Sequence, residues 1–121
     1  MIKLIKVNKE NKGYARQFLS TNLDNVYIII KDNIKVGVIE YKHLEEGLIK
    51  VEYITLENSY RGMGIAQKIV FSLLKDNDIC GDCLPISQAI HFWKSCGADF
   101  EEDVRECMEE EDCIPFTIYR K

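Results

Sequence analysis

The spacing of apolar and polar residues predicts four strands in the first half of the chain. Strands appear here either as short alternating patterns or as short uninterrupted apolar runs. Asp32 and Asn33 predict a tight turn between two of them, and residues 45–47 predict another. The four predicted strands cover residues 2–7, 26–30, 34–41 and 48–56.

Apolar residues at helical spacing predict three helices. The first is short, the second follows the longest strand, and the third has Ser87 as its N-cap and stops at Gly97. A strand over residues 79–84 separates the last two helices, and residues 100–107 and 114–119 predict a closing hairpin around an acidic turn. The apolar faces of the three helices are Tyr14, Ala15, Phe18 and Leu19; Ile65, Ala66, Ile69, Val70, Leu73 and Leu74; and Ala89, Ile90, Trp93 and Cys96.

This order of elements predicts one α/β domain over residues 1–121. The chain of 121 residues leaves room for a single domain, since domains commonly have about 100–200 residues. Its 46% hydrophobic and 30% charged residues are typical of a globular protein that folds alone. The front half is expected to be an antiparallel meander, and the middle one β-α-β unit.

The distribution of charge argues against a nucleic-acid partner. The net charge is −4, and residues 99–112 contain nine acidic residues and one basic residue, Arg105. No basic stripe with interleaved aromatic residues is present, so nucleic-acid binding is not expected. The acidic run fits a solvated turn, and the alternative is a surface for a cationic partner.

The apolar runs are too short for a membrane segment. The longest covers residues 26–30, whereas a span needs about 18 or more apolar residues. The N-terminus lacks the apolar stretch of a secretory signal, so we expect a cytoplasmic protein without a membrane partner.

Five cysteines in a chain without an export signal predict reduced thiols. Cys80 and Cys83 have C-x-x-C spacing, and together with Cys107 and Cys113 they could supply four zinc ligands. The second pair lacks the usual knuckle spacing, and residues 79–84 suit a strand. We therefore expect buried structural cysteines and no metal.

The segment after the longest strand carries the main functional signal, Arg61-Gly62-Met63-Gly64 before a helix. Glycines at such a turn let backbone N–H groups converge at a helix N-terminus, where they attract phosphate oxygens. A Walker A loop is excluded because Gly64 is not followed by Lys-Ser or Lys-Thr. A dinucleotide fingerprint is a weaker alternative: Gln67 occupies the place of its last Gly or Ala, and Asp82 lies 20 residues after Gly62.

Two motifs resemble those of the GNAT N-acetyltransferase superfamily. Residues 61–66, Arg-Gly-Met-Gly-Ile-Ala, resemble its Q/R-x-x-G-x-G/A loop, and residues 89–98 resemble its A-i-x-f-Y-e-k-x-G-F segment. The order of elements also agrees over nearly the whole chain. The resemblance implies a single-domain α/β fold with a mixed central sheet of about six to seven strands, helices on both faces and a shortened N-terminal helical region.

The resemblance also implies acetyl-CoA as co-substrate. The pyrophosphate would be held by the backbone N–H groups of the loop, with Arg61 near the phosphates. The pantetheine arm would pair with the backbone of Ile54 and Leu56, and the Leu56 N–H would donate to the thioester oxygen. The cofactor-binding residues so implied are Ile54, Leu56, Arg61, Gly62, Met63, Gly64, Ile65, Ala66 and Gln67.

Glu52 is the candidate catalytic base. An alkylammonium ion, with a pKa of about 10, must lose a proton before its nitrogen can attack a thioester. Glu52 interrupts an apolar run, and it lies nine residues before Arg61, where spermidine/spermine acetyltransferases also have a glutamate. A carboxylate in a half-buried strand tends to have a raised pKa, which suits a base. The alternative is an ion pair with Lys50 or Lys35.

The implied function is acetyl transfer to a primary amine by direct attack in a ternary complex. Trp93 replaces the tyrosine that the family uses as general acid, so a catalytically inactive CoA-binding or sensor module is the alternative, and an NAD-binding protein a weaker one. Only residues 8–25 separate the first two strands, so the acceptor groove is expected to be open or completed in a homodimer. An open groove suits peptide and protein amines as well as small cationic amines, and the acidic stretch favours a cationic acceptor.

Overall fold

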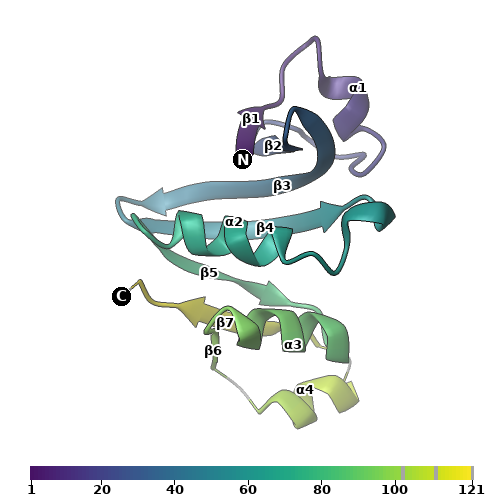
Figure 1. The fold of residues 1–121 in the computed structure, drawn as a ribbon. Helices are drawn as coiled ribbons and strands as arrows, with labels where there is room; N and C mark the ends of the chain where they lie inside the picture. The colour runs from purple at the N-terminus through teal and green to yellow at the C-terminus, as the bar shows by residue number, and fades with distance from the viewer. Residues whose placement is uncertain (102, 111, 121) are drawn as a thin grey trace. The chain divides into compact units, whose positions relative to one another are not determined.

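The computed structural model describes residues 1–101, 103–110 and 112–120, and within them seven strands form a sheet in the order β1-β2-β3-β4-β5-β7-β6 (Figure 1). The elements are β1 (Ile2–Lys6), α1 (Lys12–Ala15), β2 (Val26–Lys31), β3 (Ile34–Glu45), β4 (Leu48–Leu56), the 3₁₀ helix η1 (Asn58–Tyr60), α2 (Ile65–Leu73), β5 (Asp78–Cys83), α3 (Ser87–Ser95), β6 (Asp99–Phe100), α4 (Val104–Glu110) and β7 (Ile114–Ile118).

The chain forms two compact units that share three elements. The first contains Met1–Lys42 and Val51–Ile69, and the second contains His43–Lys50 and Val70–Lys121. The tip of the hairpin formed by β3 and β4 therefore belongs to the second unit, and α2 begins in the first unit and ends in the second.

The first unit is built on an antiparallel meander. β1 pairs with β2, and β2 pairs with β3 from Val26 opposite Glu40 to Lys31 opposite Ile34. Asp32 and Asn33 join β2 to β3 with φ values of 50° and 70°. Left-handed backbone at both central residues matches the twist of a two-residue hairpin, so the predicted turn is confirmed.

One short helix covers the core of this unit. Ala15, Val26, Ile28 and Val38 are fully buried or nearly so, and partly buried side chains pack around them. The helix α1 ends at Ala15, earlier than the apolar spacing suggests, and Phe18 and Leu19 pack from the turns that follow. A single helix of four residues between β1 and β2 confirms the shortened N-terminal helical region.

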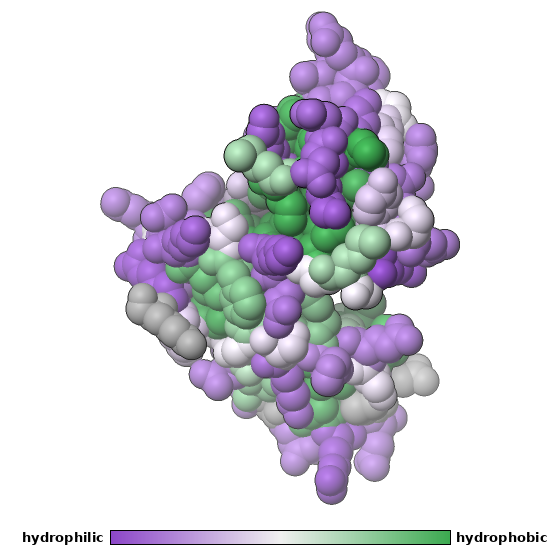
Figure 2. Space-filling model, in the orientation of Figure 1, coloured by the Kyte–Doolittle hydropathy of each residue, from purple (hydrophilic) through white to green (hydrophobic). Residues whose placement is uncertain are grey.

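The second unit contains β5 and β7 as antiparallel neighbours, with α3 beside β5. Gly97, at φ 94°, ends α3 as predicted: its N–H donates to the Lys94 carbonyl at 3.0 Å, and the Ala98 N–H donates to the Trp93 carbonyl at 3.1 Å. Ser87 is the first helical residue rather than the N-cap, and Ile86 occupies the cap position without a side-chain bond. Figure 2 shows apolar side chains reaching the surface over α2, which contains the half-exposed Phe71.

The predicted strand over residues 100–107 is wrong in its second half, because residues 104–107 belong to the helix α4. Asp103 begins it, and its Oδ1 accepts hydrogen bonds from the N–H groups of Arg105 (2.9 Å) and Glu106 (3.2 Å). Asp103 is therefore the N-cap of α4, because its carboxylate accepts hydrogen bonds from N–H groups of the first turn that have no acceptor within the helix. The strand β6 is limited to Asp99 and Phe100, which pair with β7. Glu102 and Glu111 of the acidic stretch lie outside the described residues.

No helix in residues 1–101, 103–110 and 112–120 is long and apolar enough to cross a membrane.

Candidate functional site

The loop that joins β4 to α2 has the backbone conformation that its glycines predict. The chain leaves β4 at Leu56, passes through η1 and enters α2 at Ile65. Gly62 and Gly64 have φ values of 80° and 76°, in the left-handed region that strains any residue with a Cβ atom. The two glycines are therefore required by the path of the chain.

The same loop presents unpaired backbone donors at the start of α2. The carbonyl of Gly64 accepts the first helical hydrogen bond, from the Lys68 N–H at 3.1 Å. Among the described residues, five consecutive N–H groups before and in the first turn find no acceptor, those of Gly62, Met63, Gly64, Ile65 and Ala66. A Cβ built on Gly62 or Gly64 would meet no atom within 4 Å, so space is open beside these donors. Such an arrangement can bind an anion.

Arg61 is held at the entrance of this loop. Its Nε donates to the Leu56 carbonyl at 3.1 Å, and its backbone N–H donates to the Asn58 carbonyl at 3.3 Å. The guanidinium therefore lies beside the last residue of β4. This places a permanent positive charge at the residue that directly precedes the unpaired donors in sequence.

The end of β4 has one backbone edge turned away from β3. The Glu57 N–H donates to the Val36 carbonyl on β3 at 2.8 Å. Because successive N–H groups point to opposite sides of a strand, the Leu56 N–H points away from β3. Ile54, two residues earlier on β4, is expected to present its backbone groups at the same edge as Leu56.

Gly37 allows β3 and β4 to approach closely at this point, which the sequence alone did not suggest. A Cβ on Gly37 would clash with the Thr55 carbonyl oxygen and lie 2.8 Å from the Leu56 Cα. A side chain there would have to push the two strands apart.

Glu52 lies on β4 with 33% of its side chain exposed, and Lys42 Nζ lies 3.6 Å from its Oε1. Of the lysines expected as partners, Lys50 lies 3.6 Å from Asp82, and Lys35 lies over the ring of Tyr14. Lys42 is a partner of Glu52 that sequence reasoning missed.

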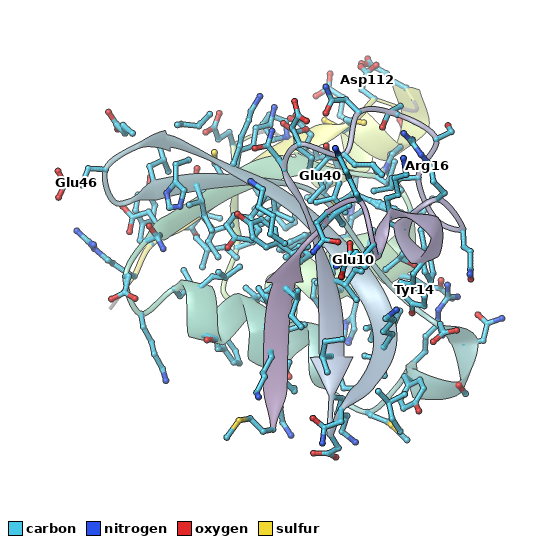
Figure 3. All side chains as sticks on the ribbon, turned by 90° about the horizontal axis from the view of Figure 1, so that it is seen from above. Glu10, Tyr14, Arg16, Glu40, Glu46 and Asp112 are labelled. Carbon is cyan, nitrogen blue, oxygen red and sulfur yellow. The ribbon has the colours of Figure 1, made fainter. Side chains whose placement is uncertain are left out.

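Glu40, labelled in Figure 3, is a second carboxyl group near Glu52. Burial raises its pKa, the negative charge of Glu52 adds to this rise, and Lys42 opposes it. The two carboxyl groups come from neighbouring strands, and sequence reasoning named only one of them. The missing information was the pairing of β3 with β4, which no local pattern supplies.

Tyr14 on α1 reaches the residue that follows β4. Its Oη donates a hydrogen bond to Glu57 Oε2 at 3.1 Å, and burial is the main cause that raises the pKa of Tyr14, followed by the hydrogen bond and charge of Glu57. Figure 3 labels Tyr14. The sequence predicted Tyr14 only as an apolar-face residue. The contact joins residues 43 positions apart, so spacing could not have revealed it.

Trp93, which the sequence resemblance aligns with a general acid, is a core residue. Only 8% of it is exposed, and its ring centroid lies 4.4 Å from that of Phe116 and 4.9 Å from that of Phe92. Its indole can donate a hydrogen bond, but it has no proton to give to a thiolate.

The cysteines give no metal site in the part of the chain that the structure describes, where no three His, Cys, Asp or Glu residues are placed to hold an ion. None of the five forms a disulfide within the described residues. Cys83, Cys96 and Cys107 are buried as expected, but Cys80 is only partly buried and Cys113 is exposed, so the expectation of buried cysteines is wrong for these two. Burial, with a contribution from Cys113, raises the pKa of Cys83 to about 11, so its thiol stays protonated at neutral pH.

Two features lie apart from the predicted site residues. A cavity of about 400 Å³ opens in the second unit, and its lining includes Phe71, Leu74, Cys96, Ile118 and Tyr119. None of the predicted site residues lines this cavity. Asp82, the acidic residue of the dinucleotide alternative, is engaged with Lys50.

Comparisons with solved structures identify the fold. No protein-family model matches the sequence, and no curated protein matches it. A structure of Naa50 from Arabidopsis thaliana in complex with a bisubstrate analogue, CoA-Ac-MVNAL, is similar over 96% of this chain and 97% of that chain, with 18% identity and a TM-score of 0.68. A GNAT-family acetyltransferase from Staphylococcus aureus Mu50 is similar over 100% of both chains, with 14% identity and a TM-score of 0.71.

A spermidine N-acetyltransferase chimera of SpeG from Vibrio cholerae and hSSAT is similar over 98% of this chain and 95% of that chain, with 10% identity and a TM-score of 0.74. These likenesses show that the chain has the GNAT fold. The predicted fold class, an α/β fold with a mixed sheet of about six to seven strands, is confirmed.

Proposed function

We propose that this chain, which has the GNAT fold, is an N-acetyltransferase that transfers the acetyl group of acetyl-CoA to a primary amine. The observation that carries the proposal is the run of unpaired N–H groups from Gly62 to Ala66, beside open space at the start of α2. The similar structures support the coenzyme, because the Naa50 structure contains a CoA bisubstrate analogue.

In this proposal the loop holds the pyrophosphate of the coenzyme. The backbone N–H groups between Gly62 and Gln67 donate to the phosphate oxygens, and the dipole of α2 adds to the attraction. The Arg61 guanidinium, fixed against the Leu56 carbonyl, contributes the positive charge. The edge of β4 turned away from β3 pairs with the pantetheine arm through Ile54 and Leu56, and the Leu56 N–H donates to the thioester oxygen.

Glu52 acts as the base in the reaction that we propose. It removes a proton from the acceptor ammonium, and the neutral nitrogen attacks the thioester carbonyl while both substrates are bound. The nitrogen of the tetrahedral intermediate loses its second proton to water, the C–S bond breaks as the carbonyl re-forms, and CoA leaves as a thiolate that takes up a proton from the solvent. The ammonium of Lys42, 3.6 Å from Glu52, has to yield its place to the acceptor ammonium before the proton can move.

The acceptor is a small cationic amine or the amine of a peptide or protein. Proteins of both kinds are among the similar structures, since Naa50 is bound to an analogue with a peptide part and SpeG is a spermidine N-acetyltransferase. The single short helix α1 leaves little chain to wall an acceptor groove, so we propose either an open groove or one that a second copy completes. Five cysteines, none of them in a disulfide within the described residues, favour the reducing cytoplasm as the location of the protein.

A second candidate function is CoA binding without turnover, as a sensor or partner subunit. The burial of Trp93 at the place of the general acid favours it. The two candidates share the loop and differ in whether Glu52 has a chemical role.

The first test is the thermal stabilisation of the purified protein by acetyl-CoA, CoA and NAD in parallel. A ligand that binds only the folded state raises the Tm, so we expect a rise with both CoA species, saturating as sites fill, and none with NAD. Release of CoA thiol in the presence of spermidine or a peptide amine then tests turnover.

The matched variants are Gly64→Ala and Gly47→Ala. Both place a Cβ on left-handed backbone, at φ 76° and 78°, so both should destabilise the fold to a similar extent. Only Gly64→Ala should lose the Tm rise with CoA, because only it distorts the donors. Equal rises in both variants, or no rise in the wild type, would contradict the proposal.

A further inference from the structure

A side-chain contact ties the short helix α1 to the residue that starts the loop. Tyr14 Oη donates to Glu57 Oε2 at 3.1 Å. The Tyr14 ring is fixed by its own packing, since it lies 5.4 Å from the ring of Phe18 and packs against the core of the first unit. The hydroxyl therefore offers the carboxylate a donor in a constant position.

The backbone of Glu57 is fixed independently of this contact. Its N–H donates to the Val36 carbonyl at 2.8 Å, and its carbonyl accepts the Tyr60 N–H at 2.9 Å. Both bonds would persist without Tyr14. The part of Glu57 that Tyr14 controls is consequently the direction of the carboxylate.

That direction matters because Glu57 is close in sequence to the unpaired donors. Only five positions separate it from Gly62, where the run of N–H groups without an acceptor begins. A carboxylate is a good acceptor for N–H groups at the start of a helix, which is why acidic residues favour that position. A Glu57 side chain released toward the loop would compete with any phosphate there and would repel it by its charge.

We infer that Tyr14 is a positioning residue for the coenzyme: it holds the Glu57 carboxylate against α1 and so keeps the loop donors open to a diphosphate. This inference rests on the proposed function. Tyr14 does not touch the coenzyme or the reacting atoms, and it acts only through Glu57.

The experiment measures the Kd of CoA by calorimetry for the wild type, Tyr14→Phe, Glu57→Gln and the double variant. Tyr14→Phe keeps the ring and frees the carboxylate, so CoA should bind on the order of tenfold more weakly. Glu57→Gln keeps an oxygen that accepts from Tyr14 and removes the competing charge, so binding should equal that of the wild type. The double variant should recover wild-type binding, since no carboxylate remains to compete.

Tyr41→Phe is the matched control. It removes a hydroxyl from another tyrosine of the first unit, one whose ring stacks on Tyr27 at 4.6 Å. Its Kd for CoA should be unchanged. In turnover, Tyr14→Phe should raise the KM for acetyl-CoA and leave kcat unaltered, which a general loss of structure would not do.

Two results would overturn the inference while leaving the proposed function intact: Tyr14→Phe binding CoA as tightly as the wild type, or the double variant binding as weakly as Tyr14→Phe. The second would mean that the hydrogen bond itself, rather than the freed charge, supports the loop. A wild-type protein that does not bind CoA would overturn both the proposed function and this inference.

Discussion

At the scale of single residues, the first unit places three charged groups together on β3 and β4. Glu52 lies next to Lys42, and Glu40 has a pKa raised by burial and by Glu52. The Lys42 ammonium lies 3.6 Å from Glu52, and its charge opposes the rise in the pKa of Glu40. The ammonium of an acceptor could take the same place as that of Lys42, because it has the same charge and hydrogen-bonding groups.

The corresponding prediction concerns Glu52→Gln. If Glu52 removes the proton, this variant should lose kcat by roughly 10²- to 10⁴-fold and keep the wild-type affinity for acetyl-CoA. The thiol-release assay and calorimetry measure the two quantities. Glu46→Gln, at the exposed tip of the same hairpin, is the matched control (Figure 3). Full activity in Glu52→Gln with its loss in Glu40→Gln would assign the base to Glu40 instead.

The sequence predicted some of these residues and not others for a physical reason. Gly62 and Gly64 were predictable because a tight strand-to-helix turn needs left-handed backbone wherever it occurs. Glu40, Lys42 and Tyr14 were not, because their roles depend on which residue of another element lies opposite them. That depends on strand register and helix placement, which local spacing does not encode.

At the scale of elements, the strands were more predictable than the acidic segment. β4 begins and ends at the predicted residues, because the turn on each side of this largely apolar segment limits where the strand can begin and end. Residues 104–110 were interpreted as part of a strand and a turn, yet Asp103 and Glu106 have the Asp-x-x-Glu spacing of a helix start. This spacing is not distinctive here, because residues 99–112 contain nine acidic residues and many of them lie three positions apart.

Asp103→Ala tests the origin of α4. Removing the acceptor for the Arg105 and Glu106 N–H groups should destabilise the protein by about 1 kcal/mol, the usual worth of an N-cap. Urea unfolding measures the change, and Asp103→Asn, which retains an acceptor oxygen, should recover most of it. An Asp103→Ala protein as stable as the wild type would show that packing of Cys107 alone holds the helix.

At the scale of the whole molecule, the order of elements sufficed for the fold class, and the order of strands in the sheet did not follow from it. β7 lies between β5 and β6, so the last strand is inserted next to an earlier one. The position of β7 depends on its pairing with strands far away in the sequence, because a single strand can form hydrogen bonds along either of its two edges. The expectation of a single domain over the whole chain stays a prediction.

The stability of the protein at alkaline pH depends on titrating groups in both units, Tyr41 in the first and Cys83 in the second. Burial raises the pKa of Cys83 from 9.0 to about 11 and that of Tyr41 from 10.0 to about 12, so the folded state keeps protons that the unfolded state loses. The contribution of Cys83 to stability is fully present below pH 9 and is lost as the pH rises to about 11. The contribution of Tyr41 is fully present below pH 10 and is lost as the pH rises to about 12. The Tm should therefore fall between pH 9 and 12, and less steeply in Tyr41→Phe. A Tm independent of pH over this range would contradict the pKa shifts.

The unpaired donors of the β4–α2 loop also have an evolutionary consequence. A site made of main-chain N–H groups constrains the path of the backbone and little else, because every residue but proline carries the same group. Met63, whose side chain is exposed, is free to change as long as the two glycines and the start of the helix persist, whereas Ile65 must also stay apolar because its side chain is buried. Such a site can be inherited through sequence divergence that erases nearly every other trace of common ancestry, so its descendants are recognised by the course of their chain.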